Sequence, residues 1–273
     1  MARREVASHD RRGFRAIILT MSSDLAPRIA DHFAEVFRRM GEGPGGVEFN
    51  LELNALRFIT RTAHPFGNFV IADGGIGAEE LRTTVAPLTE VGQPASVFLK
   101  SEASDSAIAT TLKELGFENF GSMPLMAVDL GHLAPAALPS GFEFRRVGES
   151  ERDAWVDALA EGYEIPVRLS ELCASIDGGE IALYGAFEGD RVVSTSMTFA
   201  YDGMMGIYCV ATRPSHRGKG LGAYVTAEPL HRARAEGWDM GILQASEAGF
   251  PIYKKLGFEE VGGIAMYFRM VGV

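Results

Sequence analysis

The chain has 273 residues, 47% of them hydrophobic, and a formal charge of −10 at pH 7. This composition is typical of a folded globular protein, and because both halves are acidic it argues against nonspecific binding to nucleic acid or to an anionic membrane. The two cysteines, Cys173 and Cys209, are too few for a disulfide framework. No segment reaches the roughly 20 apolar residues of a membrane span. No apolar stretch follows the N-terminal arginines Arg3 and Arg4, so we expect a cytoplasmic protein without a secretory signal.

The first half begins with an amphipathic helix. Residues 24–43 place five apolar side chains on one helical face, with Gly41 beyond the end of the helix. These side chains are Ile29, Phe33, Val36, Phe37 and Met40. Residues 64–75 then predict a strand and a turn, and residues 112–130 predict a helix end, a glycine and an alternating strand.

A linker divides the chain into two parts of similar length. Residues 131–141 contain two prolines and two glycines but no Asp, Glu, Lys or Arg. The flanking parts, 1–130 and 142–273, share one local pattern. Leu115-Gly116-Phe117-Glu118 and Leu256-Gly257-Phe258-Glu259 match at an offset of 141, and each joins a helix end to a strand. We therefore interpret the chain as a duplicated domain.

The second half predicts a mixed α/β sheet. Helices at 151–163 and 168–176 precede three strands within residues 181–212. Tight turns at Gly189-Asp190 and Asp202-Gly203 join these strands.

A long crossover helix follows and is expected to reach about Ala235. Pro229 should kink or end it, because proline removes a main-chain hydrogen bond. A strand at 239–246, a short helix at 250–257 and a last strand complete this half.

Three glycines fall between the third strand and the crossover helix, in Arg217-Gly218-Lys219-Gly220-Leu221-Gly222. Main-chain N–H groups at a helix N-terminus lack intrahelical partners and carry the positive end of the helix dipole, so this loop predicts a site for one small anion. The loop lacks the Gly-Lys-Ser/Thr ending that binds a triphosphate with magnesium, and it lacks the G-x-G-x-x-G spacing of a dinucleotide site. Both of these ligands are therefore weaker candidates.

The hexapeptide resembles the pyrophosphate loop of the Gcn5-related N-acetyltransferases (GNATs), as do the preceding strand at 206–212 and Tyr-x-x-Leu-Gly-Phe at 253–258. The resemblance implies an α/β fold with a mixed sheet and two tandem GNAT-like domains. Residues 1–130 would be a degenerate copy and residues 142–273 the catalytic acetyltransferase domain. It also implies acetyl-CoA as cosubstrate.

The same resemblance assigns roles to residues. Loop amides would bind the coenzyme A pyrophosphate, the preceding strand would pair with the pantetheine arm, and Tyr253 would donate a proton to the departing thiolate. The coenzyme-binding residues would be Cys209, Val210, Ala211, Arg217, Gly218, Lys219, Gly220, Leu221 and Gly222. Ser246 follows the next strand and either contacts the coenzyme or Tyr253, or caps the next helix.

Tyr253 can also be a core residue of an amphipathic helix. Reference pKa values near 10 for a phenol and 8.5 for a thiol make complete proton transfer uphill by roughly 2 kcal/mol. A hydrogen bond to the leaving sulfur is therefore the safer interpretation. A covalent acyl-enzyme on Cys209 is disfavoured, because buried strand cysteines are usually inert.

The general base is left open by the sequence. Four carboxylates flank the predicted acceptor groove, and each is either a base or a solvated surface charge. They are Glu161, Glu164, Asp202 and Glu247. His216 and His231 are expected at the surface, and no cluster has the spacing of metal ligands, so we expect no metal.

The first half lacks the residues that make the glycine loop of the second half a predicted anion site. At the offset of 141, residues 76–81 align with the hexapeptide, without its cation and two of its glycines. Glu79 and Glu80 would repel a phosphate, and Leu112 replaces Tyr253. We expect this copy to have lost coenzyme binding and to close one side of the acceptor groove.

The sequence thus favours an acyl-CoA-dependent N-acyltransferase. We expect direct transfer of acetyl from acetyl-CoA to a primary amine of a small molecule or peptide, and no nucleic-acid or membrane partner. The alternative is a non-catalytic acyl-CoA sensor. Tandem domains of this kind also resemble transferases that use aminoacyl-tRNA and N-myristoyltransferases, but the acidic balance and the lack of a basic tract weigh against tRNA. Whether the chain forms a homodimer stays open.

Overall fold

A computed structural model describes residues 11–43, 45–52, 54–101 and 106–271 of the chain. Arg3 and Arg4 lie outside these residues. The helices are α1 (Arg11–Glu42), α2 (Ala78–Glu90), α3 (Ser106–Glu114), α4 (Arg152–Tyr163), α5 (Val167–Ser175), α6 (Leu221–Ala235) and α7 (Phe250–Leu256). The strands are β1 (Glu48–Leu51), β2 (Ala55–Ile59), β3 (Asn68–Ala72), β4 (Ala95–Leu99), β5 (Glu118–Asp129), β6 (Glu143–Arg146), β7 (Ile181–Glu188), β8 (Arg191–Tyr201), β9 (Met204–Thr212), β10 (Met240–Gln244) and β11 (Glu259–Arg269).

The strands form one mixed sheet in the order β1-β2-β3-β4-β11-β5-β10-β9-β8-β7-β6. The predicted meander of the second half is confirmed, because β7, β8 and β9 pair antiparallel in succession. The crossover helix α6 leads from β9 to the parallel strand β10. The predicted mixed α/β fold is therefore confirmed.

The two halves repeat the same series of elements. β1–β3, α2, β4, α3 and β5 correspond to β7–β9, α6, β10, α7 and β11. The ends of α3 and α7 match bond for bond: Phe117 N–H donates to the Leu112 carbonyl, and Phe258 N–H donates to the Tyr253 carbonyl. This pattern, with a left-handed glycine, is a Schellman motif. The offset of 141 therefore holds here and places Leu112 opposite Tyr253.

The offset changes at the helix that follows the glycine loop. Helix α2 begins at Ala78 and α6 at Leu221, an offset of 143. Gly75 and Gly77 thus correspond to Gly218 and Gly220, and Glu79 corresponds to Gly222. The expectation that Gly220 has no counterpart in the first copy is wrong, whereas Gly222 still has none. The hand alignment failed because the two loops differ in length.

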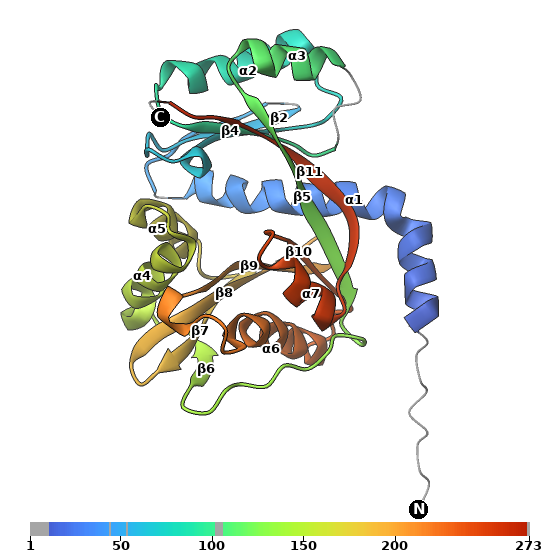
Figure 1. Ribbon diagram of the computed structural model, residues 1–273, viewed down its shortest axis with the longest axis vertical. Helices are drawn as coiled ribbons and strands as arrows, with labels where there is room; N and C mark the ends of the chain where they lie inside the picture. Colours follow the sequence, from blue (N-terminus) through green and yellow to red (C-terminus); the bar gives the residue numbers. More distant parts are fainter. Residues whose placement is uncertain (1–10, 44, 53, 102–105, 272–273) are drawn as a thin grey trace, which may run out of the picture.

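The last strands of the two halves are exchanged. β11 lies between β4 and β5, and β5 lies between β11 and β10 (Figure 1). Residues 131–141 separate the halves along the sequence, whereas in space residues 118–129 belong to the sheet of the second half. The division at residues 131–141 stays a proposal, and each half completes its sheet with a strand from the other.

Helix α1 lies between the two halves (Figure 1). Ile29, Val36 and Met40 are buried, as predicted, in a core that also includes residues of α4 and α5. The expected helix end was wrong, because α1 continues to Glu42 and includes Gly41. Its apolar face is covered on both sides, so α1 joins the halves into one body.

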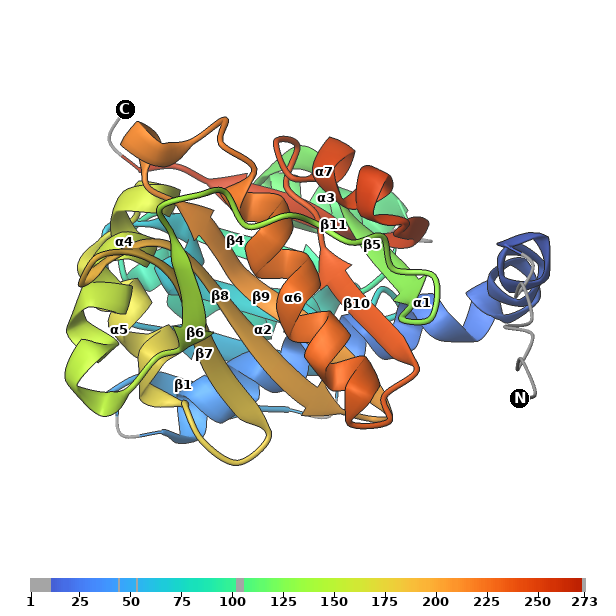
Figure 2. The ribbon, with the colours of Figure 1, turned by 90° about the horizontal axis from the view of Figure 1, so that it is seen from below.

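Helices α6 and α7 cover the opposite face of the second half (Figure 2). Helix α6 continues through Pro229 to the predicted end at Ala235, so it does not end at this proline. Pro229 is buried, and packing on the sheet holds the helix together where a hydrogen bond is missing. No helix in the described residues is long and apolar enough to cross a bilayer.

Candidate functional site

β9 and β10 separate at their carboxyl ends. They pair in parallel at Met205–Gly241 and Gly206–Ile242, and β9 then continues to Thr212. A bulge accompanies the separation, because the pairing of β9 with β8 shifts by one residue. Cys209 lies in the bulge with φ +52°. The extra residue bends β9 away from β10, and we call the space beyond Gly206 and Ile242 the β9–β10 gap.

Main-chain groups of β9 face this gap. Thr195 Oγ1 donates to the Cys209 carbonyl at 2.7 Å, and Ser194 Oγ donates to the Ala211 carbonyl at 2.8 Å, so both carbonyls face β8. Because main-chain direction alternates along a strand, the groups of Val210 face the gap. The predicted segment Cys209, Val210 and Ala211 therefore lines one side of it.

The glycine loop follows β9 and leads into α6. Gly218 and Gly220 have φ of +79° and +88°, which only glycine adopts readily. Within the described part of the chain, the N–H groups of residues 218–223 make no hydrogen bond. Leu221 and Gly222 begin the helix, where free N–H groups and the dipole favour an anion. The arrangement matches the predicted anion site.

Arg217 is exposed, and its guanidinium is bonded to neighbouring parts of the chain. Its guanidinium donates to the carbonyls of Thr212 and Gly162 and lies 3.4 Å from the Glu164 carboxylate. It therefore fastens the loop to the end of α4. Lys219 is exposed, with Nζ 5.7 Å from the Phe142 ring centroid, and is the cation free to meet an anion.

Tyr253 of α7 lies in the core beneath α6 and is 7% exposed. Burial raises its pKa to about 12, against a smaller opposing effect of the Thr226 hydroxyl. Complete proton transfer to a thiolate of pKa 8.5 would then be uphill by about 5 kcal/mol. Tyr253 is therefore suited to donate a hydrogen bond to a developing thiolate.

Sequence reasoning missed Tyr163, the last residue of α4. The predicted helix at 151–163 assigns it no role, and 47% of the residue is exposed. Its hydroxyl is nevertheless enclosed, and burial raises its pKa. The hydroxyl faces the main-chain N–H of Val210 and lies near Cys209 and Tyr253. Gly162 makes this approach possible, because a Cβ there would lie 2.8 Å from the Ala211 Cβ.

Three of the four carboxylates considered as bases are engaged in ion pairs. Glu161 pairs with Arg213, and Glu164 pairs with Arg217. Asp202 pairs with Arg28 of α1 at 2.7 Å. Glu247 is exposed in the turn before α7.

Ser246 lies in the turn before the short helix α7, where its Oγ accepts the Gly249 N–H at 3.1 Å, and Gly249 is the N-cap of the helix. The expectation that His216 is a surface residue is wrong. His216 is 6% exposed, bonded to Ser215 and lying against Phe142. His231 is half-buried, because it lies on the same helix face as neighbours that pack on the sheet.

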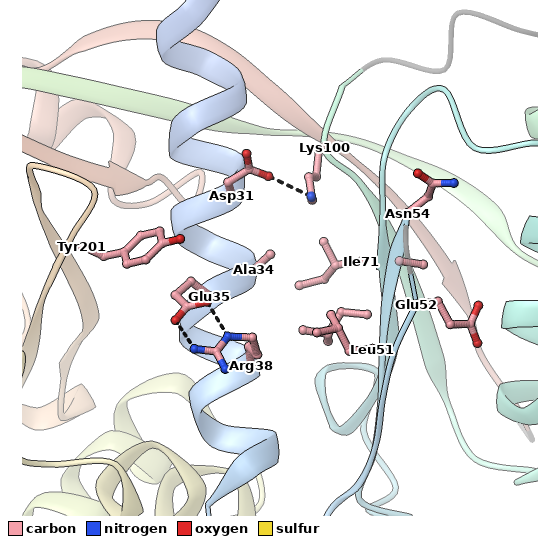
Figure 3. A pocket seen from close by; sticks show the side chains of 12 residues that line it. Asp31, Ala34, Glu35, Arg38, Leu51, Glu52, Asn54, Ile71, Lys100 and Tyr201 are labelled. Atoms are coloured by element: carbon pink, nitrogen blue, oxygen red, sulfur yellow. Dashed lines mark hydrogen bonds and ion pairs between the residues drawn. The ribbon is translucent and has the colours of Figure 1, made fainter.

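A separate hollow lies between α1 and the sheet of the first half (Figure 3). Its charges neutralise one another: Lys100 Nζ lies 2.8 Å from Asp31 and 2.9 Å from Asp73. Glu35 holds Arg38 in the same hollow. None of the predicted site residues lines it. Among the described residues no group of three or more His, Cys, Asp or Glu side chains could hold a metal ion.

Comparison with known proteins finds a family likeness in the second half. Residues 143–261 match the family described as the acetyltransferase (GNAT) domain. The chain is 32% identical over 119 residues to an L-methionine sulfoximine/L-methionine sulfone acetyltransferase of Pseudomonas paraeruginosa, covering 41% of this chain and 61% of that protein. It is 29% identical over 189 residues to a mycothiol acetyltransferase of Streptomyces scabiei, covering 63% of this chain and 61% of that protein.

A solved structure shares the fold of nearly the whole chain. The GCN5-related N-acetyltransferase from Kribbella flavida superposes with a TM-score of 0.65 at 20% identity, covering 90% of this chain and 96% of that one. The chain spans 61% of the length of the two curated relatives above.

Proposed function

Through residues 143–261 this chain belongs to the Gcn5-related N-acetyltransferase superfamily, and we propose that it transfers an acetyl group from acetyl-CoA to a primary amine of a small molecule or peptide. The observation that carries the proposal is a juxtaposition at the end of β9. Free loop amides, the outward-facing main chain of Val210 and the hydroxyl of Tyr253 all adjoin the β9–β10 gap. They suit a diphosphate, an amide-containing arm and a thioester, in that order.

Each group has a distinct task in this proposal. The N–H groups of residues 218–223, with Lys219, hold the pyrophosphate of the coenzyme. The main chain of Val210 bonds the pantetheine arm and orients the thioester carbonyl. The neutral amine then attacks the carbonyl carbon, so that a C–N bond forms and the C–S bond breaks. Tyr253 stabilises the departing sulfur with a hydrogen bond, and the amine proton is released to solvent.

A small-molecule acceptor is favoured over a macromolecule. The two curated relatives are named for small molecules, L-methionine sulfoximine or L-methionine sulfone in one case and mycothiol in the other. Cys209 has no thiolate character to act as a nucleophile, because hydrogen bonding with Cys173 and burial raise its pKa.

Two measurements test the function. Calorimetry with acetyl-CoA reports binding, and thiol release on a panel of amines, amino acids and aminoglycosides reports transfer. We expect micromolar binding and thiol release with at least one small primary amine. Binding without thiol release across the panel would favour the alternative, a non-catalytic acyl-CoA sensor. Absence of binding would refute both.

A further inference from the structure

A buried polar cluster connects helix α1 of the first half to strand β9 of the second. His32 is 0% exposed, and its Nδ1 lies 2.7 Å from the Tyr208 hydroxyl. The two rings are stacked with centroids 5.8 Å apart. A Cβ at Gly206 would lie 2.6 Å from the imidazole, so the strand needs a glycine there to admit the ring.

This cluster lies where β9 and β10 separate. Gly206 and Ile242 are the last paired residues, and Tyr208 and Gln244 are the next residues of the two strands on the same face. The Gln244 amide lies beside the Tyr208 hydroxyl. The two side chains therefore bridge the strands at the closed end of the β9–β10 gap, directly before the bulge at Cys209.

The chemistry of the cluster favours a positioning role over proton transfer. Burial lowers the pKa of His32 to about 4, so the imidazole is neutral near pH 7 and is a poor final acceptor for an ammonium proton. Its Nδ1 can instead accept the Tyr208 O–H, which fixes the direction of that hydroxyl.

The cluster is also incompletely satisfied. Within the described residues, Nε2 of His32 is buried without a hydrogen-bond partner. Such an atom costs stability that an apolar side chain of the same shape would retain. Stability alone therefore does not account for this polar side chain.

We propose that His32 is a positioning residue of the acyl site: by holding Tyr208, it fixes the spacing of β9 and β10 where the thioester end of the coenzyme binds. The first half then contributes to the site of the second through α1. This inference rests on the proposed function, because it takes the β9–β10 gap to be the place of the acyl group.

The test measures binding to the full chain and its variants His32→Leu, Tyr208→Phe and the double variant. Acetyl-CoA probes the whole site, and adenosine 3′,5′-bisphosphate, which has no acyl arm, probes the loop. We expect both single variants to weaken acetyl-CoA binding about 5- to 10-fold, with no further loss in the double variant. Binding of the bisphosphate should stay unchanged.

Tyr201→Phe is the matched control, because the Tyr201 ring lies edge-on to the same imidazole at 5.7 Å. His32→Asn keeps an acceptor oxygen near the position of Nδ1 and should recover most of the affinity. If His32→Leu fails to fold, Tyr208→Phe and His32→Asn decide the result. Unchanged acetyl-CoA affinity in Tyr208→Phe, or equal weakening of both ligands, would overturn the proposal. These readouts need no acceptor, so a failure to find transfer leaves them intact.

Discussion

The two halves of the sheet contain the same series of elements, yet their central parallel strands differ. In the first half β3 and β4 pair at four positions, and the Lys100 N–H extends the ladder to the Ala72 carbonyl. In the second half β9 and β10 pair at two positions and separate beside the bulge at Cys209. One inserted residue thus decides whether main-chain groups are used by the sheet or are available to a ligand.

The loops that follow β3 and β9 also differ, in that only the second loop has main-chain groups available to a ligand. Gly77 has φ −66°, and neighbouring Ile76 is buried in the core of the first half. Gly218 and Gly220 have positive φ, and Lys219 between them is exposed. In the first loop the Ile76 side chain is buried in the core, whereas in the second loop the main-chain N–H groups of residues 218–223 are free for a ligand. The glycines alone do not make an anion site; their backbone conformation does.

The largest effect should come from forcing the second loop toward the geometry of the first. Gly220→Val is expected to weaken acetyl-CoA binding about 1000-fold. A β-branched residue at φ +88° costs about 1–3 kcal/mol, and the displaced amides lose charge-assisted hydrogen bonds of about 1.5–3 kcal/mol each. Gly77→Val is the matched control and should leave the affinity unchanged. Calorimetry measures both, and equal affinities for the two variants would contradict the comparison.

The free energy of unfolding should depend on pH through His32, which lies at the contact between the halves. The pKa of His32 falls from 6.5 to about 4 in the folded chain because of burial, an effect that the main chain of Met204 and, to a lesser extent, the charge of Asp202 only partly oppose. Between these values the unfolded chain binds the proton that the folded chain excludes, so stability falls as pH falls from 6.5 to 4. The loss should be about 3 kcal/mol.

Urea unfolding at pH 7 and pH 4.5 checks this value. Carboxylates also titrate in this range, so the informative quantity is the difference between the wild type and His32→Asn. The variant should lose less stability on acidification. Equal losses would mean that His32 is not a source of acid sensitivity.

A smaller effect, on kcat, is expected for Tyr253, which occupies in the second half the position that Leu112 has in the first. Tyr253→Phe should lower kcat about 30-fold, since a hydrogen bond to a charged leaving group is worth about 1.5–3 kcal/mol. Acetyl-CoA affinity should be retained. Leu112→Met, which conserves core volume at the equivalent position, should leave kcat unchanged. Steady-state thiol release measures both, and full activity of Tyr253→Phe would remove this residue from the mechanism.

The smallest effect concerns Tyr163, whose hydroxyl faces the Val210 N–H that the coenzyme needs. Tyr163→Phe removes this competitor and should tighten acetyl-CoA binding about 3-fold, because a neutral hydrogen bond contributes a net of about 0.5–1.5 kcal/mol. Tyr184→Phe, at a stacked position against Phe144, serves as the control. Weaker binding in Tyr163→Phe would instead make this hydroxyl part of the coenzyme site.

Features with local signals could be predicted from the sequence. The hairpin turns at Gly189-Asp190 and Asp202-Gly203 fall where the structure has them, as do the glycine loop and the ends of α3 and α7. Turn residues and left-handed glycines act over a few positions, so one sequence is enough to read them.

Features that depend on distant neighbours could not be predicted. The approach of His32 to Tyr208 spans 176 residues of sequence. Burial of His216 depends on Phe142, which lies before α4. Helix α4 ends at Tyr163, whose hydroxyl faces the Val210 N–H of a distant strand, a contact that no local pattern indicates. Tertiary context decided each of these positions.

The interchange of β5 and β11 also constrains how the polypeptide assembles during translation. When the ribosome has completed β4, the strand that will flank it, residues 259–269, has not been made. One edge of β4 therefore stays unpaired until more than half of the chain has been synthesised after it. Such long-range pairing slows folding and exposes a strand edge to aggregation. The sheet of the first half is complete only when β11 has been made.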